Sequence, residues 1–228
     1  MLLYYFEMTL SEEDYIKAIY HLSQIDSKTV ATNAIAEQMK TKPSSVTDMV
    51  KKLSEKSLVK YKKYQGVSLS EKGRLVALSI IRKHRLWEVF LVDKLNFSWD
   101  EVHEVAEQLE HIKSDALIDK LDAHLGFPKV DPHGDPIPNK EGFFTKSVKK
   151  LISELPVLSE GVCVGVNDSS VTFLKFLDKN NIALGDTFKI LDREEFDGSV
   201  TISTRVGAIR ISEQIASNLF LEIVDEEQ

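Results

Sequence analysis

Histidines and carboxylates alternate at helical spacing within residues 84–115. The side chains in question are His84 and Glu88, followed by His103, Glu107, Glu110 and His111. The first two are four residues apart, and the last four stand at offsets of zero, four, seven and eight. On a helix these offsets place the last four on one face. Imidazole nitrogen and carboxylate oxygen are donors that divalent transition metals accept, so the pattern predicts a metal site.

The competing interpretation is a solvated, charged helix face, which is common in soluble proteins. Two features argue against it. The carboxylates of Glu104, Glu107 and Glu110 would repel one another, and Lys113 is the only base near them in the sequence. A bound cation would relieve that repulsion.

The composition excludes several classes of protein. The chain has 228 residues, 43% of them hydrophobic, and lacks an apolar run long enough to span a membrane. The opening ten residues have neither a basic region nor a cleavage site, so a signal peptide is not expected. The single cysteine, Cys163, excludes an internal disulfide and a thiolate-cluster metal site. A cytoplasmic protein is expected.

Charge is unevenly distributed along the chain. Residues 28–85 carry fourteen bases against four acids, whereas residues 86–228 carry fourteen bases against twenty-seven acids. A basic block within an acidic chain is typical of a local contact with a polyanion such as DNA.

The basic block contains the pattern of a helix-turn-helix. A first helix is predicted at 11–25, with Ser11 as its N-cap, and two more at 31–40 and 43–58, joined by a short turn. The second helix of such a pair enters the major groove. Its outward residues are Ser44, Ser45, Thr47, Asp48 and Lys51. The competing interpretation is an ordinary pair of helices, which would not explain the basic excess.

A β-hairpin is predicted directly after these helices, at 58–70, with a turn at Gln65-Gly66. Its first strand alternates lysine and tyrosine, as expected for a wing that lies beside the phosphate backbone. The wing lysines are Lys60, Lys62 and Lys63. Together with the helices, the hairpin predicts a winged helix-turn-helix.

Three further helices should follow. The first covers 71–94, the second begins near Ser98 with Glu101 completing a capping box, and the third, 114–125, stops before Gly126. Their apolar residues indicate a core or a dimer interface, between which the sequence does not decide.

Four of the six prolines then lie within 128–138, which predicts a turn-rich connector and a domain boundary. His133 within it is expected to be structural or solvent-exposed. Beyond residue 143, short apolar alternations predict a small β-barrel. Its strands are expected at 161–166, 186–191, 199–203, 209–211 and 220–224, with a short helix at 170–179 and Cys163 buried in a strand.

This organisation resembles the diphtheria toxin repressor family of metal-activated bacterial transcription repressors, over nearly the whole chain. The most specific motifs are EDYIKAIY at 13–20, PSSVTDMV at 43–50, RKHRLWEVFL at 82–91, VHEVAEQLEHIKSD at 102–115 and DPHGDPIP at 131–138. The resemblance implies a mainly helical chain with three domains. These are a winged helix-turn-helix at 1–74, a helical metal-binding and dimerisation domain at 75–142, and an SH3-like β-domain, similar to FeoA, at 143–228.

By the same resemblance, the primary metal site takes Asp14, Glu107, Glu110 and His111, with His84 shared or bridging. An ancillary site takes His84, Glu88 and His103. The iron-responsive branch has methionine and cysteine where this chain has Asp14 and Glu107, whereas the manganese-responsive branch has aspartate and glutamate there. Hard oxygen donors suit Mn²⁺, so Mn²⁺ is the expected cofactor and Fe²⁺ the alternative.

Two departures limit the resemblance. Lys17 stands where manganese regulators place a further glutamate ligand, and a charged lysine cannot coordinate. Whether the site holds one ion or two is therefore open. The chain also keeps the β-domain that the shorter manganese regulators lack, and Asp168 is the only credible donor in the matching region. Asp14 itself has a second interpretation, as the capping-box partner of Ser11.

The expected function is a homodimeric repressor that binds a palindromic double-stranded DNA operator when loaded with metal and controls metal-uptake genes. It would be neither an enzyme nor a membrane protein. A di-metal carboxylate oxidase would need Glu-x-x-His pairs, and the spacing from Glu107 to His111 is one residue too long. A metal-independent winged-helix regulator, whose acidic helix binds a protein partner, is the remaining alternative.

Overall fold

The computed structural model describes residues 8–25, 29–62, 65–145 and 148–223. The chain forms two compact units. The first comprises the described parts of Met1–Trp87, Ala106–Phe127 and Ile137–Phe144, and the second those of Glu88–Val105, Pro128–Pro136 and Thr145–Gln228. No helix among the described residues is long and apolar enough to cross a membrane.

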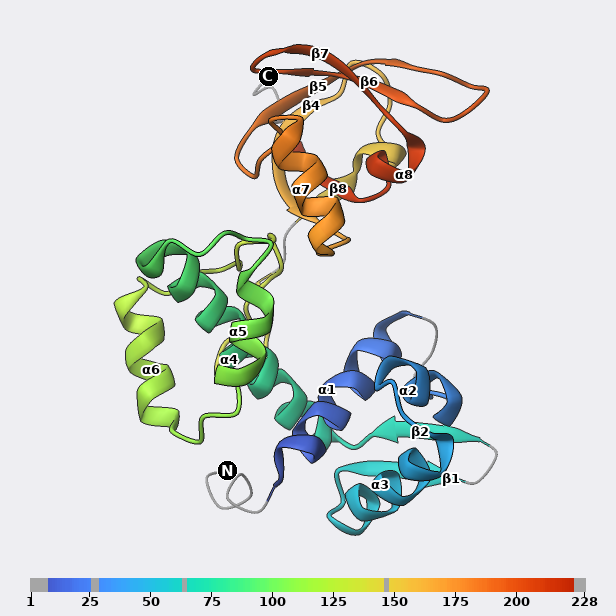
Figure 1. Cartoon of the computed structure of the whole chain (residues 1–228), viewed down its shortest axis with the longest axis vertical. Coiled ribbons are helices and arrows are strands. Elements are labelled where there is room, and N and C mark those ends of the chain that lie inside the picture. The colour runs from blue at the N-terminus through green and yellow to red at the C-terminus, as the bar shows by residue number, and fades with distance from the viewer. Residues whose placement is uncertain (1–7, 26–28, 63–64, 146–147, 224–228) are drawn as a thin grey trace. The chain divides into compact units, whose positions relative to one another are not determined.

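The first unit contains the winged helix-turn-helix that the sequence predicts (Figure 1). Its elements are α1 (Leu10–Ile25), α2 (Thr32–Gln38), α3 (Pro43–Glu55), β1 (Val59–Lys62) and β2 (Gly66–Leu69). Pro43 is the first residue of α3, where its missing N–H and restricted φ are compatible with a helix. The two strands pair antiparallel, and Val30 adds a bridge to Val67 of β2.

One apolar core joins α1 to α3. Ile16 and Ile19 of α1 are fully buried in the same cluster as Val46 and Val50 of α3. Interiors are close-packed, so a shift of α1 cannot be absorbed by empty space. The position of α1 therefore constrains the position of α3.

The N-terminus of α1 differs from the prediction. Thr9 Oγ1 accepts the backbone N–H of Glu12 at 3.3 Å, and the Glu12 carboxylate accepts the Thr9 N–H at 2.8 Å. This reciprocal pair is a capping box. Ser11 lies inside the helix, so its assignment as N-cap is wrong. Asp14 is not a capping partner, which leaves its carboxylate for another role.

Three helices complete this part of the chain: α4 (Glu71–Leu95), α5 (Val102–Leu109) and α6 (Asp115–His124). Ser70 caps α4, since its Oγ accepts the Gly73 N–H at 3.0 Å and donates to Leu58 O. A Cβ on Gly73 would lie 2.0 Å from Leu58 O, so only glycine permits this close approach. Ser114 caps α6 by accepting the Leu117 N–H.

The start of α5 also differs from the prediction. A turn at 99–101 precedes the helix, and the Ser98 hydroxyl donates to the Glu101 carboxylate at 2.7 Å. A capping box requires the serine oxygen to accept a backbone N–H, so Ser98 and Glu101 do not form one. The helix is consequently shorter at its start than expected, and it also ends at Leu109, before Glu110.

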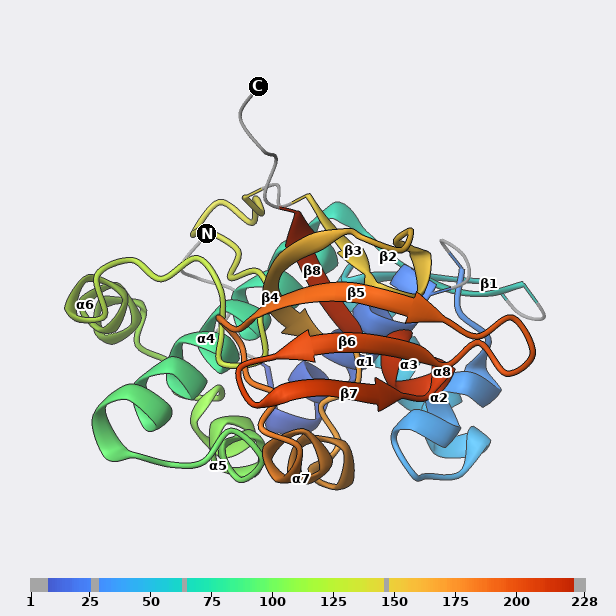
Figure 2. The ribbon, with the colours of Figure 1, turned by 90° about the horizontal axis from the view of Figure 1, so that it is seen from above.

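The second unit holds a six-stranded antiparallel sheet in the order β3-β8-β4-β5-β6-β7. Its strands are β3 (Lys149–Leu151), β4 (Glu160–Val166), β5 (Thr187–Arg193), β6 (Val200–Thr204), β7 (Gly207–Ile211) and β8 (Leu219–Ile223). Figure 2 shows β5, β6 and β7 side by side. Helix α7 (Val171–Lys179) and two short turns of helix, η2 (Ile152–Glu154) and α8 (Glu213–Ala216), complete the unit. The fold class is confirmed; β3 and α8 were not predicted.

The proline-rich segment folds into a compact turn against this sheet. Asp131 Oδ1 accepts the N–H groups of His133 and Asp135, at 2.8 and 3.0 Å. The His133 carbonyl accepts the N–H of Val166 in β4 at 2.9 Å. Gly134 has φ +82°, and a Cβ there would meet Val164 O at 1.9 Å. Glycine is thus required for the turn to lie against β4.

Candidate metal centre

Glu110 binds side chains from two other helices. It follows the last residue of α5 and is fully buried. Its oxygens lie 2.7 Å from Nδ1 of His84 in α4, and 2.6 and 2.8 Å from Nζ of Lys17 in α1. Burial acts to raise the pKa of Glu110, but the hydrogen bonds and charges of His84 and Lys17 outweigh it and lower the pKa. The carboxylate is therefore held ionised, as a metal ligand must be.

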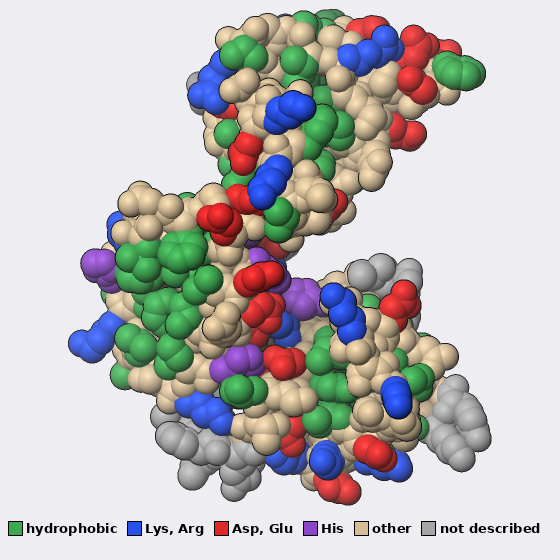
Figure 3. All heavy atoms as spheres, in the orientation of Figure 1, with side chains coloured by type: hydrophobic (Ala, Val, Ile, Leu, Met, Phe, Trp, Pro, Cys, Tyr) green, Lys and Arg blue, Asp and Glu red, His purple; other side chains and the backbone are tan. Residues whose placement is uncertain are grey.

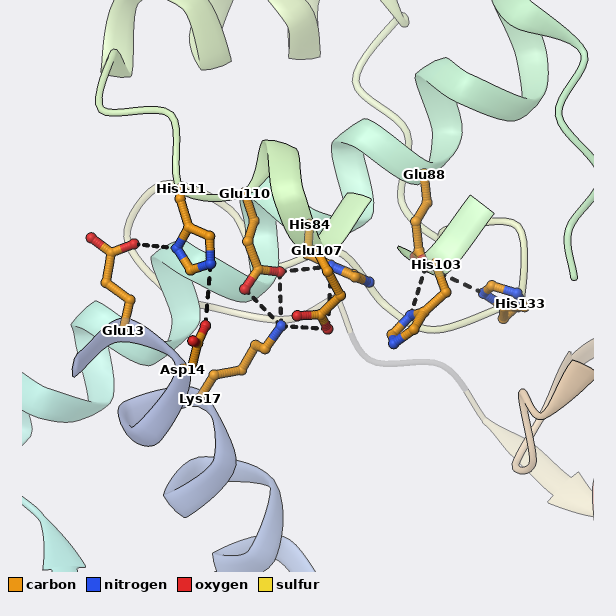
Figure 4. Close-up of polar contacts among 10 residues, drawn as sticks. All are labelled: Glu13, Asp14, Lys17, His84, Glu88, His103, Glu107, Glu110, His111 and His133. Atoms are coloured by element: carbon orange, nitrogen blue, oxygen red, sulfur yellow. Dashed lines mark hydrogen bonds and ion pairs between the residues drawn. The ribbon is translucent and has the colours of Figure 1, made fainter. Parts of the chain in front are cut away.

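His111 lies between two carboxylates of α1 (Figure 4). Its Nδ1 is 2.7 Å from Oε2 of Glu13, and its Nε2 is 3.2 Å from Oδ1 of Asp14. A carboxylate beside Nδ1 favours the tautomer with the proton on that nitrogen, which leaves Nε2 free to coordinate. Burial raises the pKa of Asp14, although the nearby His111 and Lys17 act in the opposite direction.

Glu13 was missed by sequence reasoning. It is fully buried, and its Oε1 has no hydrogen-bond partner within the described part of the chain. In the sequence it is the middle of three consecutive acids, Glu12, Glu13 and Asp14, near the start of the first predicted helix. No local signal marks it, because its partner His111 is 98 residues away.

Two groups of possible metal donors meet at Glu110. Asp14, Glu110 and His111 form one group, and His84, Glu107 and Glu110 form the other. Within each group the donor atoms lie within 4.8 Å of one another. Both groups offer oxygen and nitrogen and no sulfur, so they suit a divalent ion of hard or borderline character. The residues present therefore fit the metal ion that the resemblance implies.

Lys17, which the resemblance puts at a ligand position of the manganese regulators, lies beside these carboxylates. Its Nζ lies 2.7 Å from Glu107 as well as on both oxygens of Glu110. The nearest base in the sequence, Lys113, instead donates to the carbonyl of Met8. The argument that Lys113 is the only base near the acidic cluster therefore holds in the sequence and fails in the fold.

His103 does not belong to the same cluster as Glu107, Glu110 and His111. Its Nδ1 lies 3.4 Å from Oε1 of Glu88, and its side chain is 55% exposed. The expectation that these four form one face is wrong, because α5 ends at Leu109 and the chain turns at the last two residues.

A further group of possible donors lies in the second unit. The carboxylates of Glu88 and Asp131 and the His133 ring bring their donor atoms within 4.8 Å of one another, and all three residues are buried. His133 Nδ1 is 3.8 Å from Glu88 Oε1, and Nε2 is 2.7 Å from the carbonyl of Trp99. His133 is thus not solvent-exposed, contrary to one of the two roles expected for it.

The donor atoms of the expected ancillary set, His84, Glu88 and His103, lie within 4.8 Å of one another. Glu88 and His103 meet, while His84, one helical turn before Glu88, directs its Nδ1 to Glu110. Asp131 and His133 are candidate ligands that the sequence did not identify. Asp168 lies two residues after Val166, whose N–H donates a hydrogen bond to the His133 carbonyl. The Asp168 carboxylate accepts the Ser170 N–H at 2.8 Å.

The expected DNA-contacting residues lie on the outer side of α3 and on β1. Ser44, Ser45 and Asp48 are exposed, as are Lys51, Lys60 and Lys62. Thr47 is half-buried, and its hydroxyl donates to the carbonyl of Pro43 at 3.0 Å. Asp48 and Lys51 form an exposed ion pair at 3.5 Å. Lys63 lies outside the described residues. Figure 3 shows basic and acidic side chains together at the surface over α3.

Comparison with known proteins covers all three parts of the chain. Residues 7–67 match the family described as "Iron dependent repressor, N-terminal DNA binding domain". Residues 70–139 match "Iron dependent repressor, metal binding and dimerisation domain", and residues 150–223 match "FeoA domain".

Individual relatives agree with these matches. An uncharacterised HTH-type transcriptional regulator of Methanocaldococcus jannaschii is 37% identical over 50% of this chain and 91% of its own. The iron-dependent repressor IdeR of Mycobacterium bovis is 33% identical over 58% of this chain, and the match spans only 57% of IdeR. A solved structure titled "Manganese-dependent transcriptional repressor complex with manganese" is 32% identical, with a TM-score of 0.82, and the match covers 93% of this chain and all of that one.

Proposed function

Because the chain belongs to the iron-dependent repressor family, to which the diphtheria toxin repressor also belongs, we propose that Mn²⁺ is the ion that activates it. Membership makes the protein a metal-dependent, DNA-binding transcriptional repressor with a dimerisation domain, and not an enzyme. The resemblance seen in the sequence is thereby confirmed. The division into domains at 1–74, 75–142 and 143–228 is part of the proposal.

The contact between Asp14 and His111 carries the proposal. Asp14 belongs to α1, in the DNA-binding part, whereas Glu110 and His111 follow α5 in the metal-binding part. The donor atoms of Asp14, Glu110 and His111 lie within 4.8 Å of one another. All three donors come from α1 or from the residues just after α5. An ion held by these three residues would fix α1 against the end of α5.

Fixing α1 would also fix the recognition helix, because α1 and α3 share one core. In a homodimer this sets the separation of two recognition helices, which must match half-sites about 34 Å apart on a palindrome. The metal ion would bind this arrangement with higher affinity than other arrangements of the two recognition helices. Binding of metal would therefore stabilise the arrangement that binds DNA. By linkage, DNA must tighten metal binding by the same factor.

The preference for Mn²⁺ over Fe²⁺ rests on the donor set. Asp14, Glu107 and Glu110 supply oxygen, and no sulfur donor belongs to either group. The only cysteine, Cys163, is buried in the second unit. Soft sulfur ligands favour softer ions, whereas carboxylates suit Mn²⁺. Fe²⁺ remains the alternative, because the family includes repressors named for iron as well as for manganese.

The test is DNA binding as a function of metal. Chelator-stripped protein would be given Mn²⁺, Fe²⁺ or Zn²⁺ in turn, and its affinity measured by fluorescence anisotropy on duplexes selected from random sequence. We expect binding only with metal, strongest with Mn²⁺. Asp14→Ala should abolish the response to metal, and Asp192→Ala, a matched loss of an exposed aspartate on β5, should keep it.

Two other outcomes discriminate the alternatives. A stronger response to Fe²⁺ would identify an iron-responsive member of the family. Equal DNA binding with and without metal would instead support a metal-independent winged-helix regulator and reject the coupling through Asp14.

A further inference from the structure

Two residues of opposite charge stand side by side on the outer face of α3, the helix that a winged helix-turn-helix places in the major groove. Nζ of Lys51 lies 3.5 Å from Oδ1 of Asp48, three residues earlier in the helix. The lysine side chain is 59% exposed and the aspartate side chain 73%. An ion pair this exposed contributes little to stability, so the fold does not depend on it and both groups are accessible to DNA.

Asp48 and Lys51 differ chemically from the hydroxyl side chains on the same face. Ser44 and Ser45 can donate or accept a hydrogen bond, so they do not select one kind of base edge. The Thr47 hydroxyl is turned back on its own helix, where it donates to a backbone carbonyl at 3.0 Å. An ionised Asp48 only accepts hydrogen bonds, whereas Lys51 only donates them. Each of these two residues can therefore bind only one kind of base edge.

The carboxylate of Asp48 has one well-suited partner among the major-groove edges of the four bases. Guanine presents two acceptors there, and thymine presents an acceptor and a methyl group. Adenine presents an amino donor beside the N7 acceptor, whose lone pair repels a carboxylate. Cytosine presents an amino donor and no acceptor on the same base. Asp48 therefore favours cytosine over the other three bases.

The spacing of the ion pair matches a cytosine–guanine pair as a whole. The cytosine amino nitrogen and guanine O6 are joined by a hydrogen bond, which places them about 2.9 Å apart. The Asp48 oxygen and the Lys51 nitrogen present the complementary charges at a similar separation, 3.5 Å. The carboxylate can accept from cytosine while the ammonium donates to O6 or N7 of the guanine. One base pair can thus satisfy both side chains.

Repulsion by the DNA backbone gives a second reason for selectivity at Asp48, which lies within the basic block at 28–85. A carboxylate near the phosphates is repelled whatever the DNA sequence, so Asp48 weakens non-specific binding. A base that donates to the carboxylate offsets this repulsion, and the other bases do not. Specificity is raised in this way by penalising the wrong sites.

We propose that Asp48 and Lys51 together read one cytosine–guanine pair in each half-site of the operator, with Asp48 on the cytosine. The inference rests on the proposed function for the palindrome that two recognition helices contact, and it adds which base pair these helices select. It does not depend on which metal ion activates the protein.

The experiment measures base preference in the full-length protein loaded with Mn²⁺. Wild-type protein would select a consensus from random duplexes, and each consensus base pair would then be replaced by the other three in both half-sites. Fluorescence anisotropy gives the affinity for each duplex. The variants are Asp48→Ala, Asp48→Asn and Lys51→Ala. Glu55→Gln is the matched control, because Glu55 is an exposed acid at the other end of α3. Circular dichroism confirms that each variant is folded.

At one position of each half-site, wild type should prefer cytosine–guanine over the other pairs by about tenfold, which is within the range typical of a mismatched base pair. Asp48→Ala should largely lose this preference and keep those at the other positions, and Lys51→Ala should weaken it at the same position. Asp48→Asn should change the preferred base from cytosine to adenine, because an asparagine amide pairs with N6 and N7 of adenine. Glu55→Gln should keep the cytosine preference.

The inference is overturned if no position of the half-site requires cytosine–guanine, or if folded Asp48→Ala keeps the wild-type preference at every position. Equal changes at all positions in Asp48→Asn and Glu55→Gln would attribute the effect to net charge and would also overturn it. Equal DNA binding with and without Mn²⁺ would reject the proposed function while leaving the base preference measurable.

Discussion

Glu13 should control metal affinity without touching the metal. Its carboxylate is fully buried and accepts from Nδ1 of His111 at 2.7 Å, which leaves Nε2 directed at Asp14. Glu13→Gln keeps the size of the side chain and removes its charge. A glutamine can also present its NH₂ group to Nδ1, which would favour the tautomer with the proton on Nε2, and that nitrogen could not then coordinate.

The magnitude follows from the role of such partners. Loss of the carboxylate that orients a metal-binding histidine typically weakens affinity by roughly 10- to 100-fold. Because glutamine can still accept one hydrogen bond, we expect the lower end, about tenfold, which corresponds to about 1.4 kcal/mol. The assay is competition for Mn²⁺ between the protein and a fluorescent chelator at constant pH.

Glu12→Gln is the matched control. Glu12 is the neighbouring buried glutamate, but its carboxylate binds Lys56 at 2.8 Å and the Thr9 N–H. Its substitution should lower stability and leave Mn²⁺ affinity unchanged. Equal affinities for wild type and both variants would refute the orienting role of Glu13, and equal losses in both variants would attribute the effect to α1 as a whole.

Three further predictions concern the fold. Thr9→Ala removes the cap of α1 and should lower the free energy of unfolding by about 1 kcal/mol in urea; an unchanged midpoint would contradict the capping box. Burial raises the pKa of the Cys163 thiol to about 12, so at pH 8 a thiol reagent should modify it much faster in unfolded than in folded protein, and equal rates would contradict its burial. Arg82→Ala removes the ion-pair partner of the largely buried Asp122, whose carboxylate lies 2.6 Å from the Arg82 guanidinium. This change should lower the free energy of unfolding by about 3–5 kcal/mol. Restoring stability with Arg82→Met plus Asp122→Leu would support that cause, and a small loss in the single variant would argue against it.

The sequence alone determined the elements and the chemical class of the site. The helices, the hairpin and the β-domain follow from helical and strand periodicity, from Pro43 at a helix start and from Gly126 after a helix end. These signals depend on residues close together in the chain, so they can be recognised without knowledge of the fold. Histidine and carboxylate at helical spacing likewise indicated a metal site.

Only the tertiary structure decided which of these side chains meet. Glu110 and His111 leave the helix face that carries His103 and Glu107, because α5 ends at Leu109. His133 and Asp131 reach Glu88 through a turn that requires Gly134 against β4. Neither arrangement has a local signature, since both depend on where distant backbone segments pack.

The contacts of α1 show the same limit most clearly. Lys17 lies 90 residues from Glu107, and Glu13 lies 98 residues from His111. Periodicity identifies the face of α1 that carries these residues, but the partner of a charged side chain depends on tertiary position. The sequence therefore determined that carboxylates and histidines would bind a cation. The packing of α1 on α5 decided that one of those cations is a lysine of the chain itself.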